Sequence, residues 1–173
     1  MSAEQKELIL FSAELQPILF KDNKMNSLNL PSYPTKTQKK GDKVTIFDPL
    51  RRKYVTLTPE EWVRQHFINY LTAHLGYPLS MLANEVELQI GQKKLRCDSV
   101  LYDHQARPRM IVEYKAPGIT ITQKVFDQIS TYNLLLHVDY LIVSNGIDHY
   151  CCKMDYNSKK YLFLEEIPRY ENL

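Results

Sequence analysis

The feature that most constrains this chain is a pair of short apolar runs that carry charged residues near their ends. The runs cover residues 95–102 and 110–114, with a polar connection between them. Their length and composition predict two strands joined by a turn. Asp98 and Glu113 lie within the runs, and Lys115 follows directly after the second one. Charged groups on a half-buried sheet cost free energy unless they pair with each other or hold a metal.

The spacing of these charges places them close together. Side chains alternate along a strand, so Glu113 and Lys115 point to the same face. If the two strands pair as a hairpin, Asp98 lies beside Glu113 on the neighbouring strand. Carboxylate oxygens, together with the backbone carbonyl of Tyr114, suit a hard cation such as Mg²⁺, for which Mn²⁺ is a substitute. A metal-bound water next to a lysine is suited to phosphodiester hydrolysis. A structural ion pair between Lys115 and either acid is the alternative for this pattern alone.

Composition restricts the class of protein. The chain has 173 residues, of which 44% are hydrophobic and 24% charged, as is typical of one globular domain. It has three cysteines without zinc spacing, so we expect reduced thiols and a cytoplasmic location. Residues 1–20 contain no long uncharged run, so we expect neither a signal peptide nor a membrane span.

Positive charge gathers in one segment, although the net charge of the chain is only +2. A cluster of this kind is able to meet a phosphate backbone. A solvated surface strip is an equally good interpretation. The basic residues of the segment are Lys36, Lys39, Lys40, Lys43, Arg51, Arg52 and Lys53.

We divide the chain into an N-terminal extension and arm at residues 1–43 and a single domain at residues 44–173. Apolar positions are scattered in residues 1–24, and we interpret this segment as an extension before a natural start at Met25. Residues 26–43 combine prolines and a glycine with polar residues, which predicts an extended arm outside the core.

A hairpin and a helix are predicted ahead of the charged strands. Residues 44–57 contain two β-forming runs around an Asp-Pro turn. Thr58 is suited to cap a helix that begins with proline and ends after Leu75. Glu61 completes a capping box, and we favour this role over that of an additional metal ligand.

The strand before Asp98 and the helix after Lys115 add further candidates. Residues 84–90 alternate as in a strand, and Glu85 on it either joins the metal site or faces solvent. Residues 122–137 predict a helix with one apolar face. Gln128 and Tyr132 are four residues apart and therefore neighbours on this helix.

The remaining elements complete an α/β pattern. Residues 139–144 predict a buried strand, and residues 149–153 and 160–164 a terminal hairpin. The order helix, strand, strand, strand, helix, strand predicts a mixed sheet of at least four strands flanked by helices, with N- and C-terminal β-hairpins in addition.

In this order, Asp98, Glu113-Tyr114-Lys115 and Gln128-x3-Tyr132 resemble the PD-(D/E)xK nuclease superfamily. More narrowly, the chain is similar to the N-terminal nuclease domain of type I restriction enzyme R subunits over about residues 45–168. The strings TPEEWVRQHFINYL, ANEVEL, LRCDSVLYD and IVEYKAP carry the narrower resemblance. Cys97 stands where the superfamily name has proline, and the sequence lacks the Walker motif of the R-subunit motor.

This resemblance implies a restriction-endonuclease-like αβββαβ core and a Mg²⁺-dependent deoxyribonuclease. Asp98 and Glu113 would hold the metal together with the Tyr114 carbonyl. Lys115 would position or activate the attacking water and offset charge on the phosphate. In the superfamily the first helix sometimes lends an acid to the metal site, for which Glu61 is the candidate.

The resemblance also implies contacts with the substrate. Gln128 and Tyr132 would support the lysine or touch DNA, and Gln123 is a candidate phosphate contact. The implied partners are DNA and either a second copy of the chain or separate motor and specificity subunits. The alternative function is a non-catalytic nucleic-acid-binding or assembly module that retains the nuclease fold.

Overall fold

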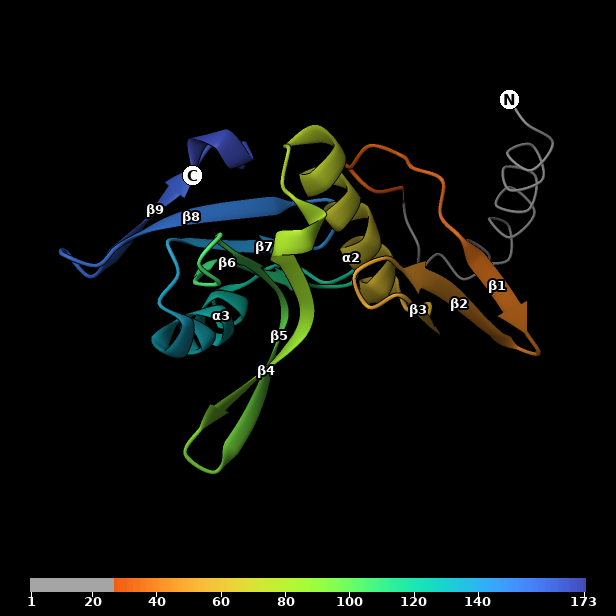
Figure 1. The fold of residues 1–173 in the computed structure, drawn as a ribbon, viewed down its shortest axis with the longest axis horizontal. Coiled ribbons are helices and arrows are strands. Elements are labelled where there is room, and N and C mark those ends of the chain that lie inside the picture. Colours follow the sequence, from red (N-terminus) through yellow and green to blue (C-terminus); the bar gives the residue numbers. More distant parts are fainter. Residues whose placement is uncertain (1–26) are drawn as a thin grey trace.

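The computed structural model describes residues 27–173, so the prediction for residues 1–24 and Met25 lies outside the described residues. A six-stranded sheet forms the centre of the fold (Figure 1). Its strands follow one another in chain order: β4 (Leu82–Ile90), β5 (Lys93–Tyr102), β6 (Pro108–Tyr114), β7 (Tyr140–Ser144), β8 (His149–Asp155) and β9 (Lys160–Leu164).

Helix α3 (Gln123–Leu136) connects β6 to β7, so these two strands run parallel, while all other neighbours in the central sheet are antiparallel. Helix α2 (Pro59–Asn69) precedes β4 and continues into η1, a π-helical turn at Tyr70–His74. Among residues 27–173 there are also two short 3₁₀ turns, η2 (Leu79–Met81) and η3 (Tyr170–Asn172). This order confirms the predicted αβββαβ core and the C-terminal hairpin, which extends the central sheet.

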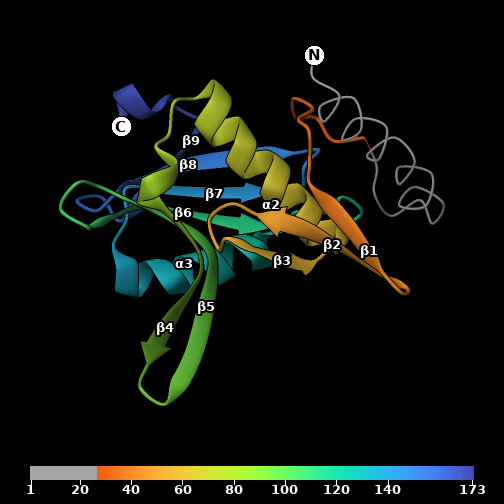
Figure 2. The same cartoon turned by 45° about the vertical axis from the view of Figure 1, so that its right-hand side comes forward.

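The two helices build separate cores on the two faces of the sheet (Figures 1 and 2). Val63 and Phe67 of α2 pack with one set of strand residues, whereas Phe126 and Ile129 of α3 pack with the other set. All five residues of β7 are buried, because both faces of this strand are covered. No helix among the described residues is long and apolar enough to cross a membrane.

A second sheet stands beside α2 and contains β1 (Thr37–Lys40), β2 (Lys43–Asp48) and β3 (Lys53–Thr56). Strands β2 and β3 are the predicted N-terminal hairpin. Strand β1 lies within residues 26–43, which were predicted to be an extended segment outside the core. The chain turns back at Gly41, which has a φ of +61°, so β1 pairs with β2. The domain boundary predicted at residue 43 therefore falls inside one hairpin.

The cap at Thr58 was predicted correctly, but the predicted capping-box role of Glu61 is wrong, because its carboxylate accepts from Arg51 and Gln65 instead. The Thr58 hydroxyl oxygen accepts a hydrogen bond from the Glu61 backbone N–H at 3.0 Å, and Pro59 occupies the first helical turn. Because this cap fixes where the helix begins, it also fixes which side chains of the first turn face the central sheet.

Candidate active site

Glu113 is the centre of a hydrogen-bonded group at the end of β6. Its Oε1 accepts hydrogen bonds from Lys115 Nζ at 2.8 Å and from Gln128 Nε2 at 2.7 Å. Gln128 Nε2 also donates to the Tyr132 hydroxyl oxygen at 2.8 Å. The Glu113 side chain is only 4% exposed. The structure thus brings together four side chains that the sequence singled out from two separate elements.

Asp98 joins this group from β5. The pairing of β5 with β6 ends at Ser99 and Val112, so Asp98 comes next to Glu113 along the two strands. Asp98 Oδ2 accepts a hydrogen bond from the Tyr114 backbone N–H at 2.8 Å. This hydrogen bond holds the Asp98 carboxylate at the end of β6, beside the residue that follows Glu113.

The charge of Asp98 influences the ionisation of Glu113. Burial, and then the charge of Asp98, raise the pKa of Glu113 to about 7. Burial also raises the pKa of Asp98, although the nearby Arg64 acts in the opposite direction. Burial would lower the pKa of Lys115, but its hydrogen bond to Glu113 and the charges of both acids raise it overall. The lysine is therefore a cation at neutral pH, and the acid pair readily keeps one proton when no cation is bound.

The two further acids proposed as metal ligands are held by arginines. Glu61 Oε1 accepts a hydrogen bond from Arg51 Nη2 at 2.6 Å, and Glu61 Oε2 lies 3.4 Å from Arg64 Nη1. Glu85 forms ion pairs with Arg64 and with Arg96, whose Nε lies 2.6 Å from Glu85 Oε2. Each acid thus has its charge compensated within the protein, as Asp98 does through Arg64 Nη2 at 2.8 Å, and a metal-binding role for any of the three stays a prediction.

The family model described as type I restriction enzyme R protein N terminus matches residues 59–168. The chain belongs to this family. A search of curated proteins finds no match. Among solved structures, the fragment of a putative HsdR subunit of a type I restriction enzyme from Vibrio vulnificus YJ016 is similar, with 17% sequence identity and a TM-score of 0.47. The likeness covers 65% of this chain and 24% of that chain, so the chain spans about a quarter of that fragment.

Glu60 is a member of the acidic group in this R-protein N-terminal domain that the sequence analysis missed. Burial and the charge of Asp98 raise the pKa of Glu60, while Lys115 lowers it. The charge of Glu60 in turn contributes to the raised pKa of Glu113. The missed signal was helical phase, because Glu60 lies one turn before Arg64, which binds Asp98, whereas the more deeply buried Glu61 is bound by Arg51.

Glu85 carries a backbone feature that no sequence pattern indicated. Its φ is +58°, which is uncommon for a residue other than glycine. The ladder between β4 and β5 is interrupted at this point, since Asn84 pairs with Ser99 and Val86 with Cys97. Strained residues of this kind gather at functional sites. In this R-protein N-terminal domain the kink lies opposite Asp98.

Two other predictions concern groups outside the acid pair. Gln123 donates a hydrogen bond to Asp127 Oδ1 at 3.0 Å on the exposed side of α3, and its phosphate contact stays a prediction. Of the basic segment, Arg51 belongs to the internal ion pairs with Asp48 and Glu61. The exposed cations of this segment in the R-protein N-terminal domain are Lys36, Lys39, Lys43, Arg52 and Lys53.

The residues present in the R-protein N-terminal domain fit a hard divalent cation. Glu113 Oε2 is buried and has no hydrogen-bond partner among the described residues, which is costly unless something else binds there. Mg²⁺ is usually held by one or two carboxylates together with waters and substrate phosphates. Within residues 27–173, no group of three or more His, Cys, Asp or Glu side chains is placed to hold a metal ion.

Proposed function

We propose that this domain hydrolyses DNA phosphodiesters with Mg²⁺ at Asp98 and Glu113. The observation that carries the proposal is that Glu113 bonds Lys115 and Gln128 in a buried position, while Asp98 on the neighbouring strand is close enough for its charge to raise the pKa of Glu113. Membership of the R-protein N-terminal family supports a nuclease-like domain and makes DNA the substrate we expect. A buried acid pair with displaced pKa values is also what a catalytic site requires.

In this proposal each acid has a defined part. Asp98 is oriented by the Tyr114 backbone N–H, and Glu113 is oriented by Lys115 and Gln128. Both would hold the metal, with the Tyr114 carbonyl as a third ligand. The bound ion would supply Lewis acidity and a more acidic water.

Lys115 acts as a fixed positive charge in the proposed mechanism. Its raised pKa makes it a poor acceptor for a proton at neutral pH. The ammonium group is therefore suited to donate hydrogen bonds to the attacking water and to the phosphate oxygens, where negative charge grows in the transition state. Of the two roles considered for this lysine, charge compensation agrees better with its surroundings than proton abstraction.

Gln128 acts as a positioning residue, since its amide holds Glu113 Oε1 and the Tyr132 hydroxyl together. Outer partners of metal-binding carboxylates fix the orientation of the ligand, and their loss commonly costs 10–100-fold in activity or affinity, as an order of magnitude. The predicted pair of α3 residues would thus act through Glu113 as well as on DNA.

The direct test is cleavage of plasmid and single-stranded DNA in the presence of Mg²⁺ or Mn²⁺. We expect cleavage by the native chain, and its loss with a chelator or with Asp98→Ala. Glu171→Ala is the matched control, because this side chain is 75% exposed and lies in η3. Cleavage that persists unchanged in Asp98→Ala would show another source of activity. DNA binding without cleavage under every metal would instead favour a non-catalytic module.

We further infer that the domain works within a larger assembly. The support is the family itself, which is described as the N terminus of a type I restriction enzyme R protein. Co-purification of the domain with the remaining restriction subunits, tested by size exclusion with and without DNA, addresses this part of the proposal independently of cleavage.

A further inference from the structure

One half of the β4–β5 hairpin leaves the central sheet. Strand β5 pairs with β6 only from Ser99 to Tyr102, whereas it pairs with β4 as far as Lys93. Residues 86–97, here called the arm, therefore have no sheet neighbour other than each other. Figures 1 and 2 both show the arm extending well beyond the other strands of its sheet.

The end of the arm carries uncompensated positive charge. Lys93 and Lys94 are exposed, and the Arg96 side chain is 66% exposed. Among residues 27–173, neither lysine forms a salt bridge with a carboxylate, while Arg96 pairs with Glu85. Free ammonium groups on a projecting element are able to displace counterions from a phosphate backbone.

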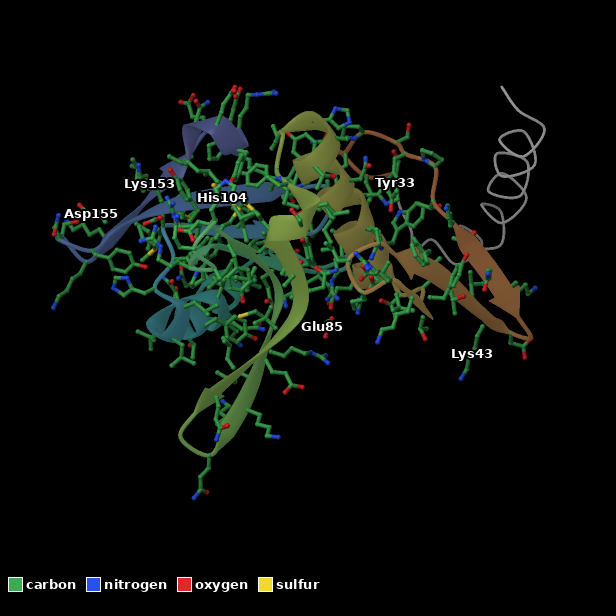
Figure 3. The ribbon with its side chains drawn as sticks, in the orientation of Figure 1. Tyr33, Lys43, Glu85, His104, Lys153 and Asp155 are labelled. Carbon is green, nitrogen blue, oxygen red and sulfur yellow. The ribbon has the colours of Figure 1, made fainter. Side chains whose placement is uncertain are left out.

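The arm is held in place at its base. Val86, Leu88 and Leu95 are partly buried against the core that α3 covers. Arg96 ties the arm to Glu85, which in turn pairs with the buried Arg64. Figure 3 labels Glu85 at the base of the arm, and the tip of the arm lies well away from it. The lysines are therefore presented at a fixed position relative to the acid pair.

Asp98 lies on the same strand as the lysines, which sets the distance between them. Lys93 is five residues before Asp98 along β5. At about 3.3 Å per residue, this corresponds to roughly 17 Å. Successive phosphates of one DNA strand advance by about 3.4 Å along the helix axis. Laid along the helix axis, the span of the arm therefore corresponds to about five base pairs.

We propose that the arm lies along duplex DNA and grips its phosphate backbone about five base pairs from the phosphate that the acid pair cleaves. Duplex DNA is the expected ligand because it stays straight over this distance and so holds a distant phosphate at a fixed spacing, which a flexible single strand does not. This inference rests on the proposed function, since it takes the acid pair as the point of cleavage.

The first test measures the affinity of the chain for a labelled duplex by fluorescence anisotropy, with a chelator present so that no cleavage occurs. The variant is Lys93→Gln with Lys94→Gln. The matched control is Lys159→Gln with Lys160→Gln, a second adjacent pair of exposed lysines at the β8–β9 turn. Loss of two phosphate contacts reduces the slope of log K against log salt by about 1.8. We expect this change, with at least about a tenfold loss of affinity at low salt, in the arm variant alone.

The outcomes separate the arm from the proposed function. Unchanged affinity and salt slope in the arm variant, or equal loss in the control, would overturn the inference even if the native chain cleaves DNA. If the arm variant loses DNA affinity as expected but the native chain never cleaves DNA, the arm stays a DNA contact and the proposed nuclease function is overturned. Absence of any duplex binding by the native chain would overturn the arm as well.

A second test measures the spacing. The cysteines Cys97, Cys151 and Cys152 are buried, so Gln92→Cys introduces an exposed thiol at the turn of the arm that accepts a photocrosslinker selectively. We expect crosslinks about five to six base pairs along the duplex from the cleaved bond. Crosslinks adjacent to that bond, or none on a duplex that is cleaved, would contradict the proposed placement.

Discussion

Arg64 Nη2 lies 2.8 Å from Asp98 Oδ1, so a buried arginine of α2 is the direct counter-ion of the first acid of the proposed site. Only 3% of the Arg64 side chain is exposed, and the same guanidinium pairs with Glu85 and approaches Glu61 at 3.4 Å. One guanidinium group thus compensates the charge of three carboxylates. The helix and the first two strands of the central sheet are joined by this charge as well as by apolar packing.

We predict that Arg64→Ala lowers the free energy of unfolding by about 3–5 kcal/mol, because it leaves Asp98 and Glu85 without their buried partner. Arg96→Ala is the control, since this side chain is 66% exposed and exposed ion pairs contribute at most about 1 kcal/mol. Urea denaturation of both variants gives the comparison. Equal and small effects would mean that water compensates the acids as well as Arg64 does.

A second prediction separates the neighbouring acids of the first turn of α2. Glu60→Gln should reduce cleavage by about tenfold, because Glu60 lies within the electrostatic reach of Asp98 and Glu113. Glu61→Gln should mainly lower the free energy of unfolding by about 1–3 kcal/mol, because Glu61 accepts from Arg51 inside the protein. Cleavage rates and urea denaturation of both variants are the measurements. If Glu61→Gln reduced cleavage while Glu60→Gln lowered only the free energy of unfolding, Glu61 and not Glu60 would be the acid that takes part in cleavage.

The sequence predicted the central group of this site because short-range rules determine it. Alternation along a strand placed Glu113 with Lys115, and hairpin pairing placed Asp98 beside Glu113. Arg64 and Glu60 were missed because their position depends on how α2 packs across the sheet, which the spacing of residues along one helix does not specify. The left-handed backbone of Glu85 was also unpredictable, since a glycine is the residue expected at such a φ.

The central helix and strands were predicted better than the outer strand β1 and the turn after β2. The long periodic pattern of α3 is typical of a helix, and the short run of β7 indicates a strand through its length and its β-branched residues. Strand β1 has the sequence Thr-Gln-Lys-Lys, in which no apolar alternation indicates a strand. It forms because β2 offers a free edge for pairing. Arg51 was read with the surface lysines, although the turn after β2 directs it to Asp48 and Glu61.

A third prediction concerns the two residues of α3 at the site. The two N–H groups of the Gln128 amide serve Glu113 Oε1 and the Tyr132 hydroxyl oxygen. Gln128→Ala should therefore lower the cleavage rate by roughly 10–100-fold. Tyr132→Phe should cost less than about tenfold, because the amide still reaches Glu113. Single-turnover kinetics distinguish the two, and Gln105→Ala, in an exposed turn, is the control. A larger effect of Tyr132→Phe would mean that the tyrosine contacts the substrate directly.

A fourth prediction concerns the pH dependence of stability without metal. Burial and the charge of Asp98 raise the pKa of Glu113 from 4.5 to about 7, so the folded chain keeps a proton that the unfolded chain releases. This contribution to stability is complete below about pH 4.5 and is lost as the pH rises through about 7. Glu113→Gln has no such proton to lose. In the presence of a chelator, the native chain should therefore lose roughly 1–3 kcal/mol relative to Glu113→Gln over this range.

Urea denaturation of both chains at intervals from about pH 4.5 to 8 measures this difference. Glu171→Gln is the control, because its parent side chain is 75% exposed and should follow the native curve. Parallel curves for the native chain and Glu113→Gln would mean that Glu113 is already ionised in the folded state at low pH. In that case Lys115 and Gln128 would outweigh burial and Asp98, and the acid pair would not retain the proton that a bound cation is expected to replace.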